Sequence, residues 1–275
     1  NSTSTMVNLT VEENDPGNTD TFTYAWTWTA DGVISTATTK SISFAVPADR
    51  AASVSVIVTD DDLGSATRDF EFIVASDGQD TVTVTEAVDG ALSYSITTDT
   101  STQNGTAAAG TNLVFSLLGG DNNFNGGNAT APLTIVTGDG ANTVTGGLGN
   151  DLVLAGDGDD SIDAGDGDDT VVSTGNDTIA GGDGNDEIEI RGFSDKVLEE
   201  TGDGIDTINF AAVTKAVKLD LTRTDAQAAT VDNDMITLIG SFENIIGGPL
   251  DDEFRGGADG NMFVGGGGVD KLFGG

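Results

Sequence analysis

The stretch that decides the fold runs from residue 137 to residue 189 and has a nine-residue period. Its successive turns are TGDGANTVT, GGLGNDLVL, AGDGDDSID, AGDGDDTVV, the eight-residue STGNDTIA and GGDGNDEIE. Most turns carry glycine at the second and fourth positions, and every turn carries Asp or Asn followed, two residues later, by one aliphatic residue. Glycine adopts positive φ without steric cost, so these turns can direct backbone carbonyls inward. A fixed short period predicts a solenoid built by stacking equivalent turns.

The eighth position of each turn supplies the predicted core. One apolar residue per turn predicts a thin core that cannot stabilise the roll by itself. These residues are Val144, Val153, Ile162, Val171, Ile179 and Ile188.

The sixth position supplies oxygen ligands for a cation. The six turns hold fourteen carboxylates and no Lys or Arg, so self-repulsion keeps the segment expanded unless counter-ions neutralise it. Carboxylate and carbonyl oxygens in a flexible backbone favour Ca²⁺ over transition metals and Mg²⁺. The candidate side-chain ligands are Asn142, Asp151, Asp160, Asp169, Asp177 and Asp186. The candidate carbonyl ligands belong to Gly138, Gly140, Gly147, Gly149, Gly156, Gly158, Gly165, Gly167, Gly182 and Gly184.

These turns resemble the RTX (repeats-in-toxin) nonapeptide Gly-Gly-x-Gly-x-Asp-x-aliphatic-x, which residues 146–154 and 181–189 match at every defined position. The resemblance implies a parallel β-roll with two nonapeptides per coil, so that turn n stacks on turn n+2 with Ca²⁺ between them. It also implies one edge lined by Asp151, Asp169 and Asp186, and another lined by Asn142, Asp160 and Asp177. Asn142 and the shortened turn of Asp177 depart from the consensus, so we expect weaker or missing sites there.

The repeat returns further along the chain. TGDGIDTIN (residues 201–209) offers Asp206, and the turns after Gly247 offer Asp252 and Asp270 as further ligands. The closing Gly274-Gly275 begins another turn, which suggests a piece of a longer protein. The predicted organisation is a β-sandwich over residues 1–75, a connecting β segment over 76–136, an RTX roll over 137–193, a β-rich flank over 194–246 and the start of a second roll over 247–275.

Residues 1–75 alternate apolar and polar side chains, which predicts short antiparallel strands of a sandwich. The segment Tyr24-Ala25-Trp26 with Asp31-Gly32 resembles PKD and related immunoglobulin-like modules, which implies a spacer or adhesive domain. Trp26 and Trp28 share one strand face, which favours core residues, while a sugar-stacking platform that contacts cell-surface glycans is the alternative. The alternating Val7-x-Leu9-x-Val11 is either the first strand of the sandwich or a strand donated to a neighbouring subunit.

Composition excludes several classes of function. The chain has no His and no Cys, so Ser-His-Asp and Cys-His catalysis, ordinary zinc sites and disulfides cannot be built. A net charge of −36 argues against a nucleic-acid partner, and no apolar run is long enough for a membrane span. The Asp-Gly-Asp segments lack the Gly and Glu of an EF-hand, and no Lys-Ser/Thr follows a Gly-rich turn as in a phosphate loop. We expect no enzyme in this chain.

We therefore expect an all-β, extracellular, calcium-binding structural protein of the bacterial surface, which self-associates into a surface layer, sheath or filament. The RTX resemblance implies export in an unfolded state by a type I system. Two alternatives stay open: a stalk fragment of a large RTX adhesin, and the noncatalytic RTX tail of a secreted hydrolase or toxin.

Overall fold

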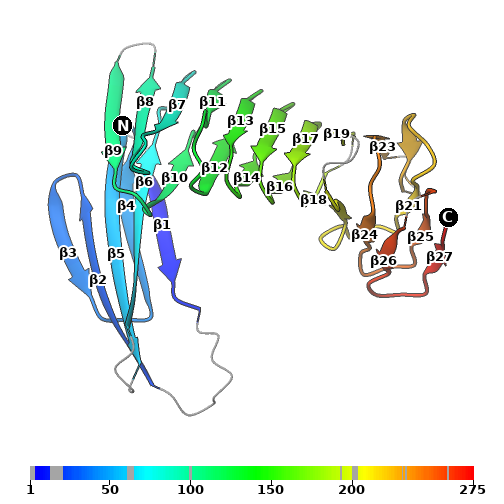
Figure 1. The fold of residues 1–275 in the computed structure, drawn as a ribbon, viewed down its shortest axis with the longest axis horizontal. Helices are drawn as coiled ribbons and strands as arrows, with labels where there is room; N and C mark the ends of the chain where they lie inside the picture. Colours follow the sequence, from blue (N-terminus) through cyan, green and yellow to red (C-terminus); the bar gives the residue numbers. More distant parts are fainter. Residues whose placement is uncertain are drawn as a thin grey trace.

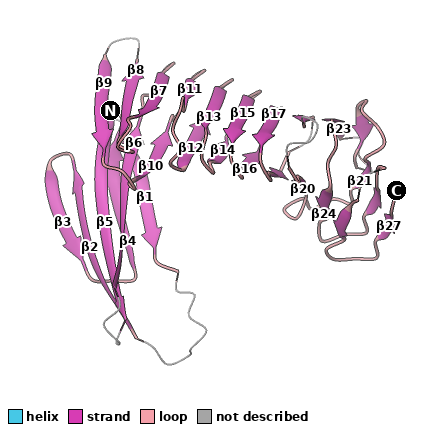
Figure 2. Ribbon diagram, viewed as in Figure 1, coloured by secondary structure: helices cyan, strands magenta, loops and turns pink. Residues whose placement is uncertain are grey.

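The protein is all-β in the computed structural model. The structure describes residues 4–12, 21–60, 65–98, 101–192, 194–199, 204–230, 232, 234–258 and 260–275. Strands, turns and loops make up these residues, with no helix among them, as Figure 2 shows. Within the same ranges, therefore, no helix has the length and apolar character needed to cross a bilayer. The all-β prediction is confirmed.

Two facing parallel stacks of short strands build the roll (Figure 1). The first stack contains β10 (Asn112–Ser116), β12 (Leu133–Gly138), β14 (Leu152–Ala155), β16 (Thr170–Ser173), β18 (Glu187–Ile190), β20 (Thr207–Asn209), β24 (Asn244–Ile246) and β26 (Met262–Val264). The second contains β11 (Asn123–Asn125), β13 (Thr143–Gly147), β15 (Ser161–Asp166), β17 (Thr178–Asp183), β19 (Lys196–Leu198) and β23 (Met235–Ile239). Consecutive strands alternate between the stacks, so each turn lies on the turn two repeats away, as predicted for a β-roll.

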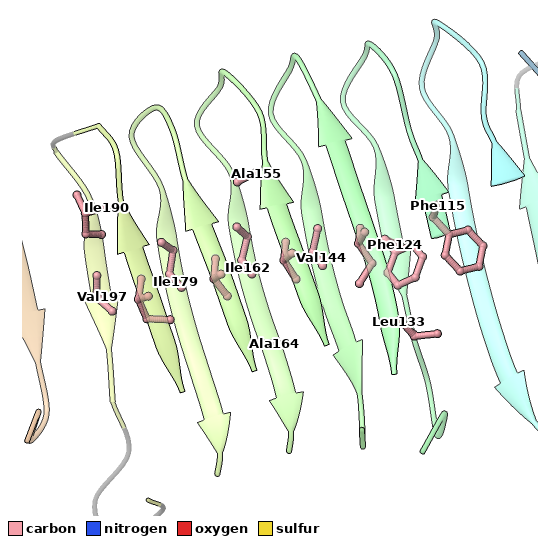
Figure 3. Packing of buried hydrophobic residues seen from close by; sticks show 14 of the residues in the cluster. Phe115, Phe124, Leu133, Val144, Ala155, Ile162, Ala164, Ile179, Ile190 and Val197 are labelled. Atoms are coloured by element: carbon pink, nitrogen blue, oxygen red, sulfur yellow. The ribbon is translucent and has the colours of Figure 1, made fainter. Parts of the chain in front are cut away.

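The core of the roll is a row of aliphatic side chains in register. Val153 pairs with Val171 across β14 and β16, and Ile162 pairs with Ile179 across β15 and β17. All six predicted eighth-position residues are buried. Larger side chains fill the N-terminal end, where Phe115 and Phe124 lie side by side, while smaller aliphatic residues follow along the stack (Figure 3).

The N-terminal residues form two facing sheets around a second core. A four-stranded antiparallel sheet contains β2 (Phe22–Ala30), β3 (Val33–Ala37), β5 (Arg50–Asp60) and β6 (Ser65–Val74), and β1 (Ser4–Thr10) pairs with β4 (Ser41–Pro47). Trp26 is buried in this core and its Nε1 donates to the carbonyl of Thr39 at 2.7 Å, while Trp28 stacks on Phe44. The tryptophans are therefore core residues. Strand β1 pairs within its own chain.

No separate linker joins this sandwich to the roll. Strand β6 pairs antiparallel with β5 and parallel with β10, so one sheet runs through both parts. Likewise β7 (Thr81–Glu86) pairs parallel with β11 and antiparallel with β8 (Leu92–Thr97), which in turn pairs with β9 (Thr102–Ala107). The parallel stacks thus begin inside the connecting segment of residues 76–136, well before Thr137.

Parallel stacking continues to the C-terminal end. Strands β21 (Lys218–Asp220), β25 (Glu253–Arg255) and β27 (Lys271–Phe273) form a parallel sheet opposite β24 and β26. The short β22 (Gln227–Ala228) pairs antiparallel with β23. The residues after Gly247 thus form stacked parallel strands, and β26 continues the sheet of β20 and β24.

The aromatic pair gives a first prediction. Phe115 and Phe124 are both fully buried, with ring centroids 5.0 Å apart. Phe124→Ala should lower the free energy of unfolding by about 3–5 kcal/mol, because it opens a cavity among residues that cannot move in to fill it. Urea denaturation in excess calcium measures this loss. Phe273→Ala, at an exposed position, is the control and should change the value by less than about 0.5 kcal/mol. Equal losses in the two variants would contradict the prediction.

Candidate calcium-binding edges

The sixth-position residues form two continuous rows, one along each edge of the roll. Edge A consists of Asp80, Asn122, Asn142, Asp160, Asp177 and Asp195, and edge B of Asp151, Asp169, Asp186, Asp206 and Glu243. Almost all of these polar side chains are buried. Each one directly precedes a strand of the stack, so the regular strand pairing fixes its place.

Hydrogen bonds connect each row from one coil to the next. On edge B the backbone N–H of Asp151 donates to Asp169 Oδ1 at 2.6 Å, and the N–H of Asp169 donates to Asp186 Oδ1 at 2.8 Å. On edge A the N–H of Asp160 donates to Asp177 Oδ1 at 2.9 Å, so the row continues through the shortened turn. The predicted division of the sixth-position residues between two edges is thus observed. One carboxylate oxygen of each residue serves the preceding coil.

The second oxygen is left without a partner at two successive positions of edge B. Among the described residues, Asp169 Oδ2 and Asp186 Oδ2 are buried and accept no hydrogen bond. A buried anionic oxygen without a donor or counter-ion is strongly unfavourable. These two atoms therefore mark a place where the fold needs either a proton or a metal ion.

Backbone carbonyls face the same edge. Gly182 has φ +107°, and a Cβ at this residue would lie 1.8 Å from the carbonyl oxygen of Gly165. A Cβ at Gly184 would lie 2.0 Å from the carbonyl oxygen of Gly167. On edge A, Gly156 and Gly158 stack in the same way on the carbonyls of Gly138 and Gly140. Only glycine allows such close stacking of carbonyls, which explains the glycines at the second and fourth positions.

Burial shifts the titration of these carboxylates. Desolvation raises the pKa of Asp169 to about 8, and the charges of Asp151 and Asp186 add to the effect, although the hydrogen bond from the Asp151 N–H opposes it. Burial likewise raises the pKa of Asp177 to about 7 and the pKa values of Asp151 and Asp186 to about 6. Carboxylates held in this state need a proton or a metal ion.

A pH dependence follows for the protein in chelator. The folded-state pKa values lie above the unfolded value of about 3.9, so the folded roll binds more protons than the unfolded chain. The stabilisation by protonation is complete below about pH 4 and is lost as pH rises through about 6 to 8. Without calcium, the far-ultraviolet circular dichroism should therefore show more strand near pH 5 than near pH 8. Saturating calcium should abolish this difference, and a metal-free chain that gains strand towards pH 8 would contradict the argument.

The donor set fits Ca²⁺. Within the described ranges no three Asp, Glu, His or Cys side chains gather in one cluster, so a site made of side chains alone is not present. On edge B, within the described residues, the gap between the coils of Asp169 and Asp186 instead offers one partnerless carboxylate oxygen from each of these two residues together with glycine carbonyls. Such mixed, hard oxygen donors suit calcium. On edge B the residues that would hold it are Asp169 and Asp186 with Gly165, Gly167, Gly182 and Gly184.

The remaining predicted ligands lie in equivalent places. Asp206 continues edge B, where its Oδ1 accepts the N–H of Asp186 at 2.8 Å. Asp252 and Asp270 form a separate row in the C-terminal roll, where the N–H of Asp252 donates to Asp270 Oδ1 at 2.9 Å. Asp252 Oδ2 also accepts the N–H of Gly248, as Asp151 Oδ2 accepts that of Gly147.

Four members of the two edges were not predicted from the sequence: Asp80, Asn122, Asp195 and Glu243. Their hydrogen bonds place them in the rows, for example the bond from the N–H of Asp206 to Glu243 Oε2 at 2.9 Å. All four share the local pattern of the other members, an acidic or amide residue two positions before a buried apolar residue. That pattern was available in the sequence. Asp195 lies nine residues after Asp186 and Glu243 lies nine residues before Asp252, so the repeat spacing could have found both, whereas the spacing is not kept at Asp80 and Asn122.

Comparison with known families agrees with this geometry. The family model of the RTX calcium-binding nonapeptide repeat, which spans four copies, matches residues 136–171, 172–195 and 246–275. These stretches make up about a third of the chain and contain the turns of residues 137–189 and those after Gly247. No curated protein matches the chain. The chain therefore carries RTX calcium-binding repeats, while the PKD-like resemblance of residues 1–75 remains a prediction.

Proposed function

We propose that this chain is a secreted structural protein of the bacterial surface, which folds on calcium and assembles into a layer, sheath or filament. The observation that carries the proposal is the row of buried carboxylates on edge B, where Asp169 Oδ2 and Asp186 Oδ2 find no partner within the described structure. A fold that buries such oxygens is complete only where calcium is abundant, which is outside the cell.

The energetics support folding after export. Extracellular calcium modules bind with dissociation constants on the order of 10⁻⁴ M, so each site contributes about 1.4 kcal/mol at roughly 1 mM calcium. Four to six sites then contribute about 6–8 kcal/mol, which is comparable with the whole stability of a small domain. At the low calcium of the cytosol this contribution is absent. The chain would therefore remain unfolded and suited to a type I secretion channel.

A structural role fits the chemistry better than catalysis. The chain contains no His or Cys, and the buried carboxylates are already engaged in the rows that join successive coils. The strongly negative surface also argues against nucleic-acid partners. Self-association, and contacts with cell-surface glycans, belong to this proposal.

Size-exclusion chromatography with light scattering tests the assembly. We expect an expanded monomer in chelator and polymers in about 5 mM calcium, a concentration well above the expected dissociation constants. The same concentration of Mg²⁺ is the control, because Mg²⁺ demands a rigid octahedral shell and should not induce folding. A compact monomer in calcium would overturn the assembly and favour the stalk of a monomeric adhesin. Half-maximal folding at low micromolar calcium would overturn the secretion step.

A second candidate is the adhesin stalk. Its support is the single sheet that runs from the sandwich into the roll through β6 and β10, because a stalk needs modules that do not pivot. The noncatalytic tail of a secreted hydrolase or toxin has no observation in its favour beyond the repeats themselves.

A further inference from the structure

The side-chain amides of edge A occupy positions that carboxylates occupy elsewhere along the two edges. Asn142 Oδ1 accepts the N–H of Asn122 at 3.0 Å, as the aspartates do for their own neighbours. The second polar atom of the side chain differs from that of an aspartate, because Asn142 Nδ2 is a donor. It donates to the carbonyl of Gly140 at 2.9 Å and to Asp160 Oδ1 at 3.0 Å. An amide therefore satisfies a backbone carbonyl that would otherwise face a second anionic oxygen.

The same arrangement recurs at Asn122. Its Oδ1 accepts the N–H of Asp80 at 2.9 Å, and its Nδ2 lies 3.1–3.4 Å from the carbonyls of Leu117, Gly119 and Gly120. Asn261 differs, because its Oδ1 accepts the N–H of Gly257 in its own turn while its Nδ2 donates to the carbonyls of Phe242 and Glu243. At the acidic positions the comparison atoms are Asp169 Oδ2 and Asp186 Oδ2, which are buried without a donor in the part of the chain that the structure describes.

We propose that Asn122 and Asn142 replace calcium ions, so that their turns bind no metal and the N-terminal end of the roll folds without calcium. An asparagine supplies in one neutral group what an aspartate and its cation supply together: an acceptor for the preceding coil and a positive end for the carbonyls. The inference rests on the proposed binding of calcium by the acidic turns.

Two further features make the N-terminal end independent of metal. Its core is large, because Phe115 and Phe124 pack edge to face and Tyr94 packs on Phe115. Its first coil is covered by antiparallel strands, since β5 pairs with β6 and β8 pairs with β7. The acidic coils instead present one or two small aliphatic residues each, such as Val153 and Val171. Apolar burial supplies at the N-terminal end the stabilisation that calcium supplies in the acidic coils. The folded N-terminal end would then provide the coil on which the first calcium-dependent coil stacks, and each further coil would stack on the one before it.

Hydrogen exchange measured by mass spectrometry on the full chain in chelator tests whether the N-terminal end of the roll is folded without calcium. Residues 101–138 should exchange at least about tenfold more slowly than residues 150–190, because local exchange reports local stability. Added calcium should slow exchange in residues 150–190. Equal, fast exchange of both regions in chelator, with both slowed by calcium, would overturn this inference and leave calcium-driven folding intact. If calcium changes neither region, the proposed function fails instead.

Two substitutions, one from amide to carboxylate and one from carboxylate to amide, test whether the asparagine side chain replaces a calcium ion. Asn142→Asp should add one bound calcium ion, counted by equilibrium dialysis, and should speed exchange of residues 122–145 in chelator by about tenfold or more. Asn123→Asp, at an exposed neighbouring position, adds the same charge and should do neither. An unchanged calcium count in Asn142→Asp, with wild-type exchange, would contradict the assignment.

The reverse substitution, from carboxylate to amide, keeps the proposal testable if Asn142→Asp does not fold. Asp169→Asn retains Oδ1 as the acceptor for Asp151 and replaces the partnerless Oδ2 with a donor. This variant should bind fewer calcium ions than the wild type. In chelator, its amide hydrogens over residues 164–172 should nevertheless exchange more slowly than those of the wild type. The control is Asp166→Asn, an exposed residue of the same turn, which removes the same charge. If both variants slow exchange equally, charge relief explains the effect and the amide replacement is wrong.

Discussion

Removing calcium from the folded protein should abolish the order of the acidic coils. In excess chelator at about pH 8, above the raised pKa values of most of these carboxylates, residues 150–190 should lose their hydrogen-exchange protection. The physical reason is that the sites together contribute about 6–8 kcal/mol at millimolar calcium, whereas the core of these coils is one thin row of aliphatic side chains. Small-angle scattering should show expansion of the same sample.

This effect should be reversible and specific. Restoring calcium should return both the protection and the compact dimensions, while the same ionic strength of NaCl should restore neither, because screening of surface charge does not supply ligands for buried oxygens. Acidic coils that remain protected in chelator at this pH would show that apolar burial alone holds the roll, contrary to the argument.

Asp186→Ala should strongly destabilise the roll. Its Oδ1 accepts the N–H of Asp169, and its own N–H donates to Asp206. Truncation leaves the Asp169 N–H buried without an acceptor, at about 1–3 kcal/mol, and removes a ligand from the calcium gap, at about 1.4 kcal/mol. We expect a total loss of about 2–4 kcal/mol in the free energy of unfolding, measured by urea denaturation in saturating calcium.

The matched control is Asp183→Ala in the same turn. Asp183 is exposed, so its removal deletes an equal charge without touching the row and should change stability by less than about 0.5 kcal/mol. A calcium count by equilibrium dialysis should fall in Asp186→Ala and stay unchanged in Asp183→Ala. Equal behaviour of the two variants would mean that net charge governs the roll, and not the buried row.

The repeat was predictable because its geometry is periodic. A strict spacing from Asp151 to Asp169 places equivalent residues on the same edge, and an aliphatic residue two positions later fixes the inward face of each strand. These local relations predicted a solenoid with one buried aliphatic residue per turn, while the RTX resemblance implied the parallel roll and its two edges. The family match to residues 136–171, 172–195 and 246–275 supports the same part of the chain.

The N-terminal start of the roll was not predictable by the same means. Asp80 and Asn122 are neighbours on edge A although 42 residues separate them, because the hairpin of β8 and β9 is inserted between their coils. No period survives such an insertion. The continuity of the sandwich sheet with the roll was equally hidden, since the pairing of β6 with β10 depends on tertiary contacts and not on a local pattern.

The stacking direction of the coils also determines how the roll responds to force. Equivalent residues of neighbouring coils are 18 residues apart in the chain, yet neighbouring strands of a sheet are only about 4.8 Å apart. Tension along the long axis acts parallel to the hydrogen bonds between strands, so coils are pulled off one at a time from an end. When one coil unfolds, about 4.8 Å of length along the roll axis is replaced by up to about 60 Å of extended chain. The roll would thus act as a reserve of length, and the calcium concentration would set how readily that reserve is released and recovered.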